Sequence, residues 1–217
     1  MIRYSLIAAS LLIVASCDAP GVRALDQQQK AGSEVQAATA LPNDLSDPVN
    51  AKTARNKARA CLELAQKAVA TAQANTDGAR NDAACARESY AKILSDADPV
   101  TAADFVGQME AYRLTRETST STGAGRQANS AIAQVASQFS SAVPGQAAGP
   151  YYTADSLYWQ ASFASSTDRA CDDLSAAAAA LDTASGGTNT PNFPSFRGSV
   201  RDLDALVTRD AAQKGCA

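Results

Sequence analysis

Small apolar residues recur at alternating steps of three and four along most of this chain. Alanine alone supplies 49 of the 217 residues. This spacing gathers the small side chains on one side of an α-helix, where alanine lets two helices approach closely. The first stripe of this kind comprises Ala51, Ala54, Ala58, Cys61, Ala65, Ala68 and Ala72.

Further stripes with helical spacing follow to the C-terminus. Their larger members are Tyr90, Ile93, Phe105, Met109, Ile132, Val135, Phe139, Leu174, Leu181, Leu203 and Val207. No segment alternates with the period of two that is typical of a half-buried strand. We therefore predict an all-α fold, an antiparallel helical bundle or a short α-solenoid of six to seven helices.

One part of this pattern resembles a tetratricopeptide repeat. Its apolar positions are matched by Leu157, Ala170, Leu174 and Ala177, although Tyr158 stands where the repeat has a small residue. We expect the helix that contains Leu157 to begin near Ala154, with Thr153 as its N-cap, after a break at Gly149-Pro150. The resemblance implies a stack of helical hairpins.

The N-terminus has the features of a bacterial secretory signal. Arg3 supplies a positive charge, and Leu6 to Ala15 form an uncharged apolar stretch too short to span a bilayer. The segment ends Val14-Ala15-Ser16-Cys17, which resembles the lipobox of bacterial lipoproteins. That resemblance implies removal of residues 1–16 as a signal peptide and acylation of Cys17, which would anchor the mature chain in a membrane.

The remaining chain divides into a tether and a folded domain. Residues 17–46 comprise the lipidated N-terminus and a polar, Gln-rich segment that either keeps the domain clear of the membrane or packs on it. We predict the helical domain over 47–217, beginning at Asp47-Pro48, a cap followed by proline in the first turn. Asp18, directly after the lipobox cysteine, resembles a signal for retention in the inner membrane rather than the outer one.

Four cysteines remain beyond the lipobox, an even number that favours two disulfides in an exported chain. Cys171 and Cys216 lie symmetrically about the loop centred on 193–194, so an antiparallel helical hairpin brings them together. Cys61 and Cys85 are related in the same way about Gln73, although Cys85 lies away from the centre of its own stripe. We predict the pairs Cys61–Cys85 and Cys171–Cys216.

Composition excludes several classes of function. The chain has no histidine, which removes histidine acid–base chemistry and most zinc sites. Its net charge of −3 argues against binding to nucleic acid. Sequence signatures of nucleotide, dinucleotide and serine-hydrolase sites are missing from the sequence. We expect no metal, no cofactor and no catalysis, and we retain carboxylate pairs such as Glu110/Glu117 and Asp172/Asp173 as the alternative hydrolase site.

Aromatic residues cluster between 151 and 163. The spacing puts Trp159 and Phe163 on one face of a helix and Leu157 with Ala161 on the opposite face, with Tyr158 between them. Either this helix is central to the fold, or part of its aromatic face is open to a partner. We take Tyr158, Trp159 and Phe163 as the candidate binding residues, with Trp159 partly exposed.

The leading hypothesis is a lipid-anchored lipoprotein of the cell envelope that faces the periplasm. It would act as a non-catalytic protein-interaction module, with another envelope protein as its partner. The alternative is a small-ligand or cell-wall-binding module, which an enclosed apolar cavity would favour. A hydrolase would require two buried carboxylates that share a cleft.

Overall fold

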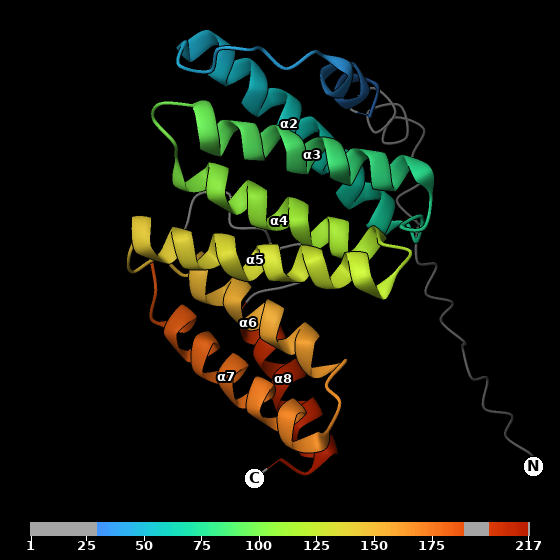
Figure 1. Cartoon of the computed structure of the whole chain (residues 1–217), viewed down its shortest axis with the longest axis vertical. Helices are drawn as coiled ribbons and strands as arrows, with labels where there is room; N and C mark the ends of the chain where they lie inside the picture. The colour runs from blue at the N-terminus through green and yellow to red at the C-terminus, as the bar shows by residue number, and fades with distance from the viewer. Residues whose placement is uncertain (1–29, 189–199, 217) are drawn as a thin grey trace, which may run out of the picture.

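A computed structural model describes residues 30–188 and 200–216 of the chain, and these residues form helices and turns (Figure 1). The predicted all-α class is confirmed. Helical residues 30–38 come first, and seven helices follow within the described ranges: α2 Pro48–Ala70, α3 Asp77–Asp96, α4 Ala102–Thr118, α5 Thr122–Ala142, α6 Ala148–Ala161, α7 Thr167–Ser185 and α8 Val200–Lys214. The predicted signal peptide and residues 17–29 of the predicted tether, Cys17 among them, lie outside the described residues.

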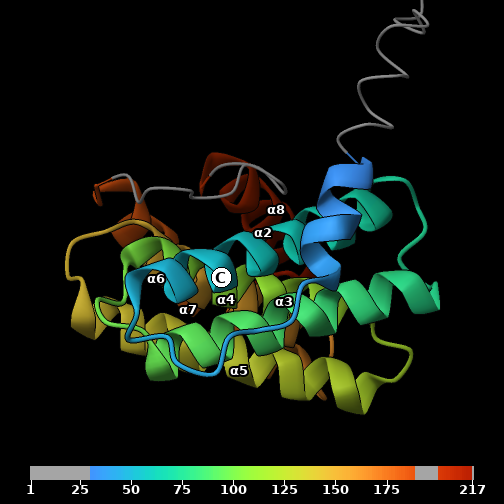
Figure 2. The ribbon, with the colours of Figure 1, turned by 90° about the horizontal axis from the view of Figure 1, so that it is seen from above.

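The helices form a stack in which each packs antiparallel to its neighbours in the sequence. From α2 to α7 they follow one another down the molecule in Figure 1, and α8 packs against α7 and α6. The turns α2–α3, α4–α5 and α6–α7 therefore lie along one edge of the stack, which we call the odd-turn edge. The turns α3–α4 and α5–α6 lie along the other edge (Figures 1 and 2).

Local signals set the starts of most helices. Asp47 caps α2 by accepting hydrogen bonds from the backbone N–H groups of Val49 and Asn50, with Pro48 in the first turn, as the sequence predicts. Thr101 and Asp104 form a reciprocal capping box at the start of α4. These side chains pair backbone donors that the first turn of a helix leaves without a partner.

The prediction for α6 is wrong at its start. The helix begins at Ala148 and runs through Gly149-Pro150, which we expected to break the chain. Proline is tolerated there because the N–H that it lacks would have no intrahelical partner in the first turn. Thr153 is consequently inside the helix and donates to the Gly149 carbonyl at 3.0 Å instead of acting as a cap.

Two apolar cores meet at α4. A small, alanine-rich core joins α2 and α3 to the Ala111 side of α4, and a larger core with aromatic members joins the Met109 side of α4 to α5–α8. Close approach is necessary where α3 meets α4, since a Cβ on Gly107 would fall 2.2 Å from the Tyr90 ring. Small residues therefore set the spacing between neighbouring helices, as the alanine stripe predicts.

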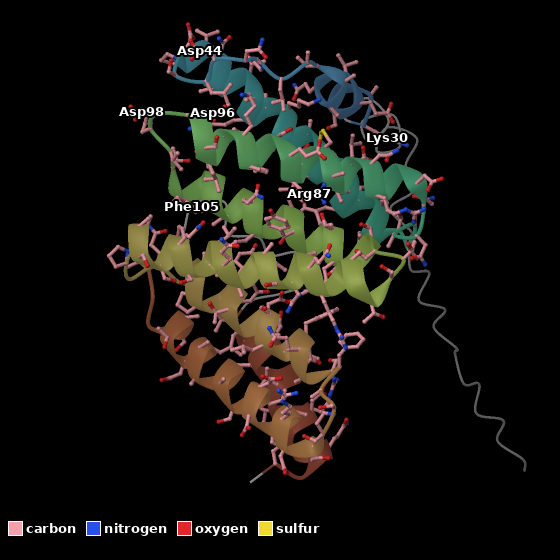
Figure 3. The ribbon with its side chains drawn as sticks, in the orientation of Figure 1. Lys30, Asp44, Arg87, Asp96, Asp98 and Phe105 are labelled. Atoms are coloured by element: carbon pink, nitrogen blue, oxygen red, sulfur yellow. A yellow bond between two sulfur atoms is a disulfide. The ribbon has the colours of Figure 1, made fainter. Side chains whose placement is uncertain are left out.

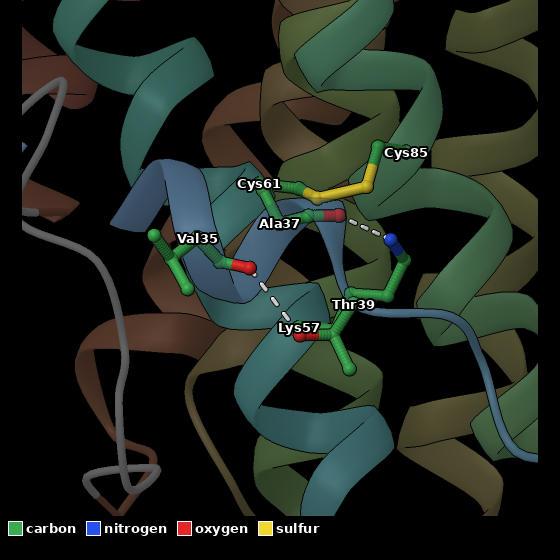
Figure 4. Close-up of a disulfide and its surroundings, with 6 residues drawn as sticks. All are labelled: Val35, Ala37, Thr39, Lys57, Cys61 and Cys85. Atoms are coloured by element: carbon green, nitrogen blue, oxygen red, sulfur yellow. Dashed lines mark hydrogen bonds between the residues drawn. A yellow bond between two sulfur atoms is a disulfide. The ribbon is translucent and has the colours of Figure 1, made fainter. Parts of the chain in front are cut away.

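Residues 30–46, which we assigned to the polar tether, pack on the domain. Leu45 is buried in the alanine-rich core, and Leu41 and Ala37 lie against the same core. The Lys57 ammonium donates to the Ala37 carbonyl (Figure 4), and the Ser33 hydroxyl donates to Glu63 at 3.3 Å. The described part of this segment therefore packs on the domain, against α2, which is the second of the two expectations from the sequence.

Both predicted disulfides are present. Cys61 and Cys85 join α2 to α3 (Figure 4), with Cα atoms 5.8 Å apart, and Cys171 joins Cys216 with Cα atoms 5.3 Å apart. Such bonds persist in oxidising compartments outside the cytoplasm, which agrees with an exported chain. None of the helices in the described ranges is long and apolar enough to cross a membrane.

Removing either disulfide should lower the free energy of unfolding by about 2–4 kcal/mol. The Cys171–Cys216 pair encloses 45 residues and the Cys61–Cys85 pair 24, so loop-closure entropy makes the former more stabilising by about 0.5 kcal/mol. Denaturant unfolding of the two double Cys→Ala variants checks this order. A larger loss from the Cys61/Cys85 variant would contradict it.

Candidate functional site

The centre of the stack contains charged side chains that are almost completely buried. They lie on α4, where Glu110 and Arg113 are each 1% exposed and Arg116 is 6% exposed. At 100° per residue, Glu110 lies between the sides of α4 that face the two apolar cores, whereas Arg113 and Arg116 follow Val106 and Met109 on the side of the larger core. Buried charge is costly unless it is paired, so the partners of these charged side chains decide what the site can do.

Glu110 connects three helices. Arg113 donates to both of its carboxylate oxygens, from Nε at 2.8 Å and from a terminal nitrogen. Gln66 of α2 donates to Oε1 at 3.1 Å, and the Tyr152 hydroxyl of α6 donates to Oε2 at 3.1 Å. Arg113 also donates to Glu117 at 2.8 Å. The cluster therefore joins α2, α4 and α6 through charge-assisted hydrogen bonds.

The charge on Glu110 is stabilised by its partners. Burial alone would raise the pKa of this carboxyl. The neighbouring Arg113 charge and the hydrogen bonds from Arg113, Gln66 and Tyr152 outweigh burial, so the pKa lies below its ordinary value. Burial also raises the pKa of Tyr152 well above its ordinary value, and the Glu110 charge adds to this effect. Glu110 is ionised and Tyr152 is neutral at physiological pH.

The pair Glu110/Glu117, a hydrolase candidate from the sequence, is thus bridged by a single guanidinium. A general acid needs a raised pKa and access to substrate. Glu110 has a lowered pKa and is buried, so this arrangement supports a structural role. Asp172 and Asp173 lie on α7 beside an open cleft. In the parts of the chain that the structure describes, no three acidic or cysteine side chains gather as a metal site would require.

A second ion pair supports the aromatic residues. Arg116 pairs with Asp155 of α6 at 2.8 Å and donates to the Asn129 side chain of α5 at 2.7 Å. Its guanidinium carbon lies 5.7 Å from the centroid of the Trp159 ring, within the range of a cation–π interaction. The Asn129 amide in turn donates to the Ser156 carbonyl at 3.1 Å. This network fixes the C-terminal half of α6 against α4 and α5.

Trp159 and Phe163 stand together at the odd-turn edge. Their ring centroids are 4.5 Å apart, Trp159 is half-buried and Phe163 is 47% exposed. Ala161 is buried, and Leu157 packs on the larger core from the opposite face of α6. The two faces of the helix therefore separate as the sequence predicts. We call Trp159 and Phe163 the aromatic surface.

An open cleft lies on each side of the aromatic surface. The first, of about 610 Å³, extends from Val69 at the end of α2 past Arg116 to the α4–α5 turn at residues 119–122. The second, of about 680 Å³, is bordered by Arg126 of α5 and by the first turns of α7. Trp159 and Phe163 line both clefts.

Tyr158, the third candidate, is placed elsewhere. It faces α8, where its hydroxyl donates to the Asp210 carboxylate at 2.8 Å, and it packs against the larger core. It is not among the residues that line either cleft. The sequence places Tyr158 between the two faces of its helix but does not show that α8 covers that side.

Sequence reasoning missed Arg113 and Arg116 as members of the site. Charges three and four residues apart on a helix are typical of exposed ion pairs, and that spacing occurs here for Glu110, Arg113 and Glu117. Only the packing of α4 among its neighbouring helices buries these charges.

Comparison with protein-family models, with curated proteins and with solved structures finds no match.

Replacing Glu110 with Gln should lower the free energy of unfolding by about 3 kcal/mol at neutral pH, because Arg113 loses its closest counter-charge. A lowered pKa in the folded state stabilises above the ordinary pKa and loses that contribution as the pH falls. The difference from wild type should therefore shrink below about pH 4. Urea unfolding across pH measures it. Glu88→Gln is the control, since the Glu88–Arg87 pair is exposed and should change little.

Replacing Gly125 with Ala should change the emission of Trp159, which is the only tryptophan in the chain. A Cβ on Gly125 would lie 3.3 Å from Cζ2 of that ring, so the ring must move by a few tenths of an ångström. Gly123→Ala is the matched control in the same helix, because a Cβ there meets nothing within 4 Å. Identical emission spectra for the two variants would contradict the packing of Trp159 on α5.

Proposed function

We propose that this chain is a lipid-anchored lipoprotein of the cell envelope that acts as a non-catalytic interaction module. Its anchor is Cys17, exposed by removal of residues 1–16, and its domain faces the periplasm. Asp18 favours the inner membrane. The aromatic surface is the docking surface, and this surface is the observation that carries the proposal.

Two observations support export and anchoring. The first 17 residues resemble a lipoprotein signal, with the cysteine at the position that the lipobox requires. The two disulfides agree with an oxidising compartment. The acyl chains that the lipobox implies on Cys17 would supply the contact with the membrane.

The form of the site supports binding to a broad surface rather than to a small molecule. Small ligands are usually enclosed in concave, largely apolar pockets. Both clefts here are open, and polar or charged side chains line much of each. An exposed Phe163 beside a half-buried Trp159 has the composition of a hot spot at an interface. Such a surface fits another envelope protein, the partner predicted from the sequence, or the surface of the membrane itself.

The anchor and the docking surface require separate tests. Cys17→Ala should move the protein from the membrane fraction to the soluble or unprocessed pool, and mass spectrometry of the native protein should find acyl chains on Cys17. A mature N-terminus at another residue would refute the anchor. Trp159→Ala should keep membrane attachment through Cys17.

For the docking surface, a photocrosslinking residue at position 163 in the native envelope should give products that Trp159→Ala diminishes several-fold. The matched control is the same residue at position 49, since Val49 is also highly exposed but lies at the start of α2, away from the odd-turn edge. Equal labelling from positions 49 and 163 would argue against a docking surface. The cost of Trp159→Ala in stability should stay below the roughly 3–5 kcal/mol of a fully buried tryptophan.

A further inference from the structure

We infer that the aromatic surface docks on the zwitterionic headgroup layer of the bilayer that carries the anchor. This inference rests on the proposed acylation of Cys17, and it names the membrane as the surface that Trp159 and Phe163 contact. Four observations carry it: where the described chain begins, the length of chain before that point, the side chains of the surface, and the charges around it.

The described chain begins at the odd-turn edge. Ser33 bonds Glu63 whereas Ala37 bonds Lys57, so residues 30–38 run antiparallel to α2 and Lys30 points toward the end of α2. Lys30 and Glu34 also influence the pKa of Asp82, near the start of α3. In Figure 3, Lys30 lies on the side of the α2–α3 turn, opposite to Asp44 and Asp98. The chain from Cys17 therefore joins the stack at the edge that bears the aromatic surface.

The length of the preceding chain limits how far this edge can be from the membrane. Thirteen residue steps separate Cys17 from Lys30. A fully extended chain of that length spans at most about 45 Å. The stack from α2 to α6 comprises four interhelical spacings of about 8–10 Å, roughly 30–40 Å in total. Trp159 and Phe163 can therefore reach the headgroups while the tether remains attached.

The side chains of the aromatic surface suit the boundary between water and lipid. Tryptophan is enriched there because its ring is apolar and its N–H is polar, and phenylalanine inserts its ring among the upper acyl groups. Within the described ranges, the exposed large apolar residues are Val35, Val49 and Phe163. Of these three residues, Phe163 is the one that lines the two clefts at the odd-turn edge.

The charges around the surface are mixed. Arg126 and Arg169 are exposed and border the second cleft, and Asp172 and Asp173 border the same cleft. A purely anionic membrane would attract the guanidinium groups and repel the carboxylates. Zwitterionic headgroups present phosphate to arginine and ammonium to aspartate, so they match both signs. The charge pattern therefore gives no net attraction to acidic phospholipids and fits zwitterionic ones.

The test uses the native acylated protein in phosphatidylcholine–phosphatidylethanolamine vesicles, with Trp159 as the intrinsic reporter. Phospholipids brominated on the upper acyl chain should quench its emission by at least half, and the emission should shift to shorter wavelength than in detergent. Phe163→Ala should reduce the quenching at least twofold, because the side chain that inserts beside Trp159 is removed. Val49→Ala, which removes an exposed apolar side chain elsewhere, should leave the quenching unchanged.

Other outcomes separate the possible failures. Protein that does not float with vesicles would refute the anchor, and with it this inference. Protein that floats, with Trp159 unquenched by bromolipid and open to soluble acrylamide, would overturn the inference while the anchor stands. Shielding of Trp159 only when envelope proteins are reconstituted with it would also overturn the inference and identify a protein as the occupant.

Lipid composition provides an independent check of the charge argument. Replacing half of the phosphatidylethanolamine with phosphatidylglycerol should not strengthen the quenching, since repulsion of Asp172 and Asp173 offsets the attraction of Arg126 and Arg169 to net negative charge. The double variant Asp172→Asn/Asp173→Asn should be quenched more strongly on the acidic vesicles. Stronger quenching of the wild-type protein on the acidic vesicles would overturn the assignment to zwitterionic headgroups.

Discussion

The paired charge of Glu110 and Arg113 is the constraint on which the middle of this fold depends. Neither group can remain buried without the other, and Glu110 also takes hydrogen bonds from Gln66 on α2 and Tyr152 on α6. A shift of one of these helices along the stack would leave a charge without its partner. The cluster therefore sets the register of α2, α4 and α6, whose alanine-rich and glycine-lined contacts would specify position only weakly.

The disulfides and the buried ion pairs stabilise different parts of the stack. The disulfides close the hairpins at its two ends, α2–α3 and α7–α8, whereas the ion pairs of Glu110 and Arg116 lie in its middle. Alanine buries little area, so the α2–α3 hairpin in particular gains stability from its cross-link. From α4 onwards the helices contain larger apolar side chains, and these surround the charges and exclude water from them. Arg116 contacts the ring of Trp159 and therefore holds that side chain against the middle of the stack.

The sequence predicts features that depend on short segments and misses those that depend on stacking. Helical periodicity, the cap at Asp47 and both disulfides follow from neighbouring residues or from the symmetry of a hairpin. The start of α6 was missed because proline usually indicates the end of a helix, although the first turn of a helix tolerates it. Burial of Arg113 was missed because a helix within a stack has neighbours on several sides, and an amphipathic pattern reveals only one of them. The same reason explains why Cys85 bonds from outside its apolar stripe, and why Tyr158 lies against α8.

The packing of residues 30–46 on α2 has a consequence for how copies of this protein meet. A stack of helices leaves an unsatisfied apolar face at each end, onto which another stack can add. Here Leu41 and Leu45 fill that face with the chain's own segment, and Leu45 is buried. The segment therefore covers the apolar side of α2 onto which a second stack would otherwise add.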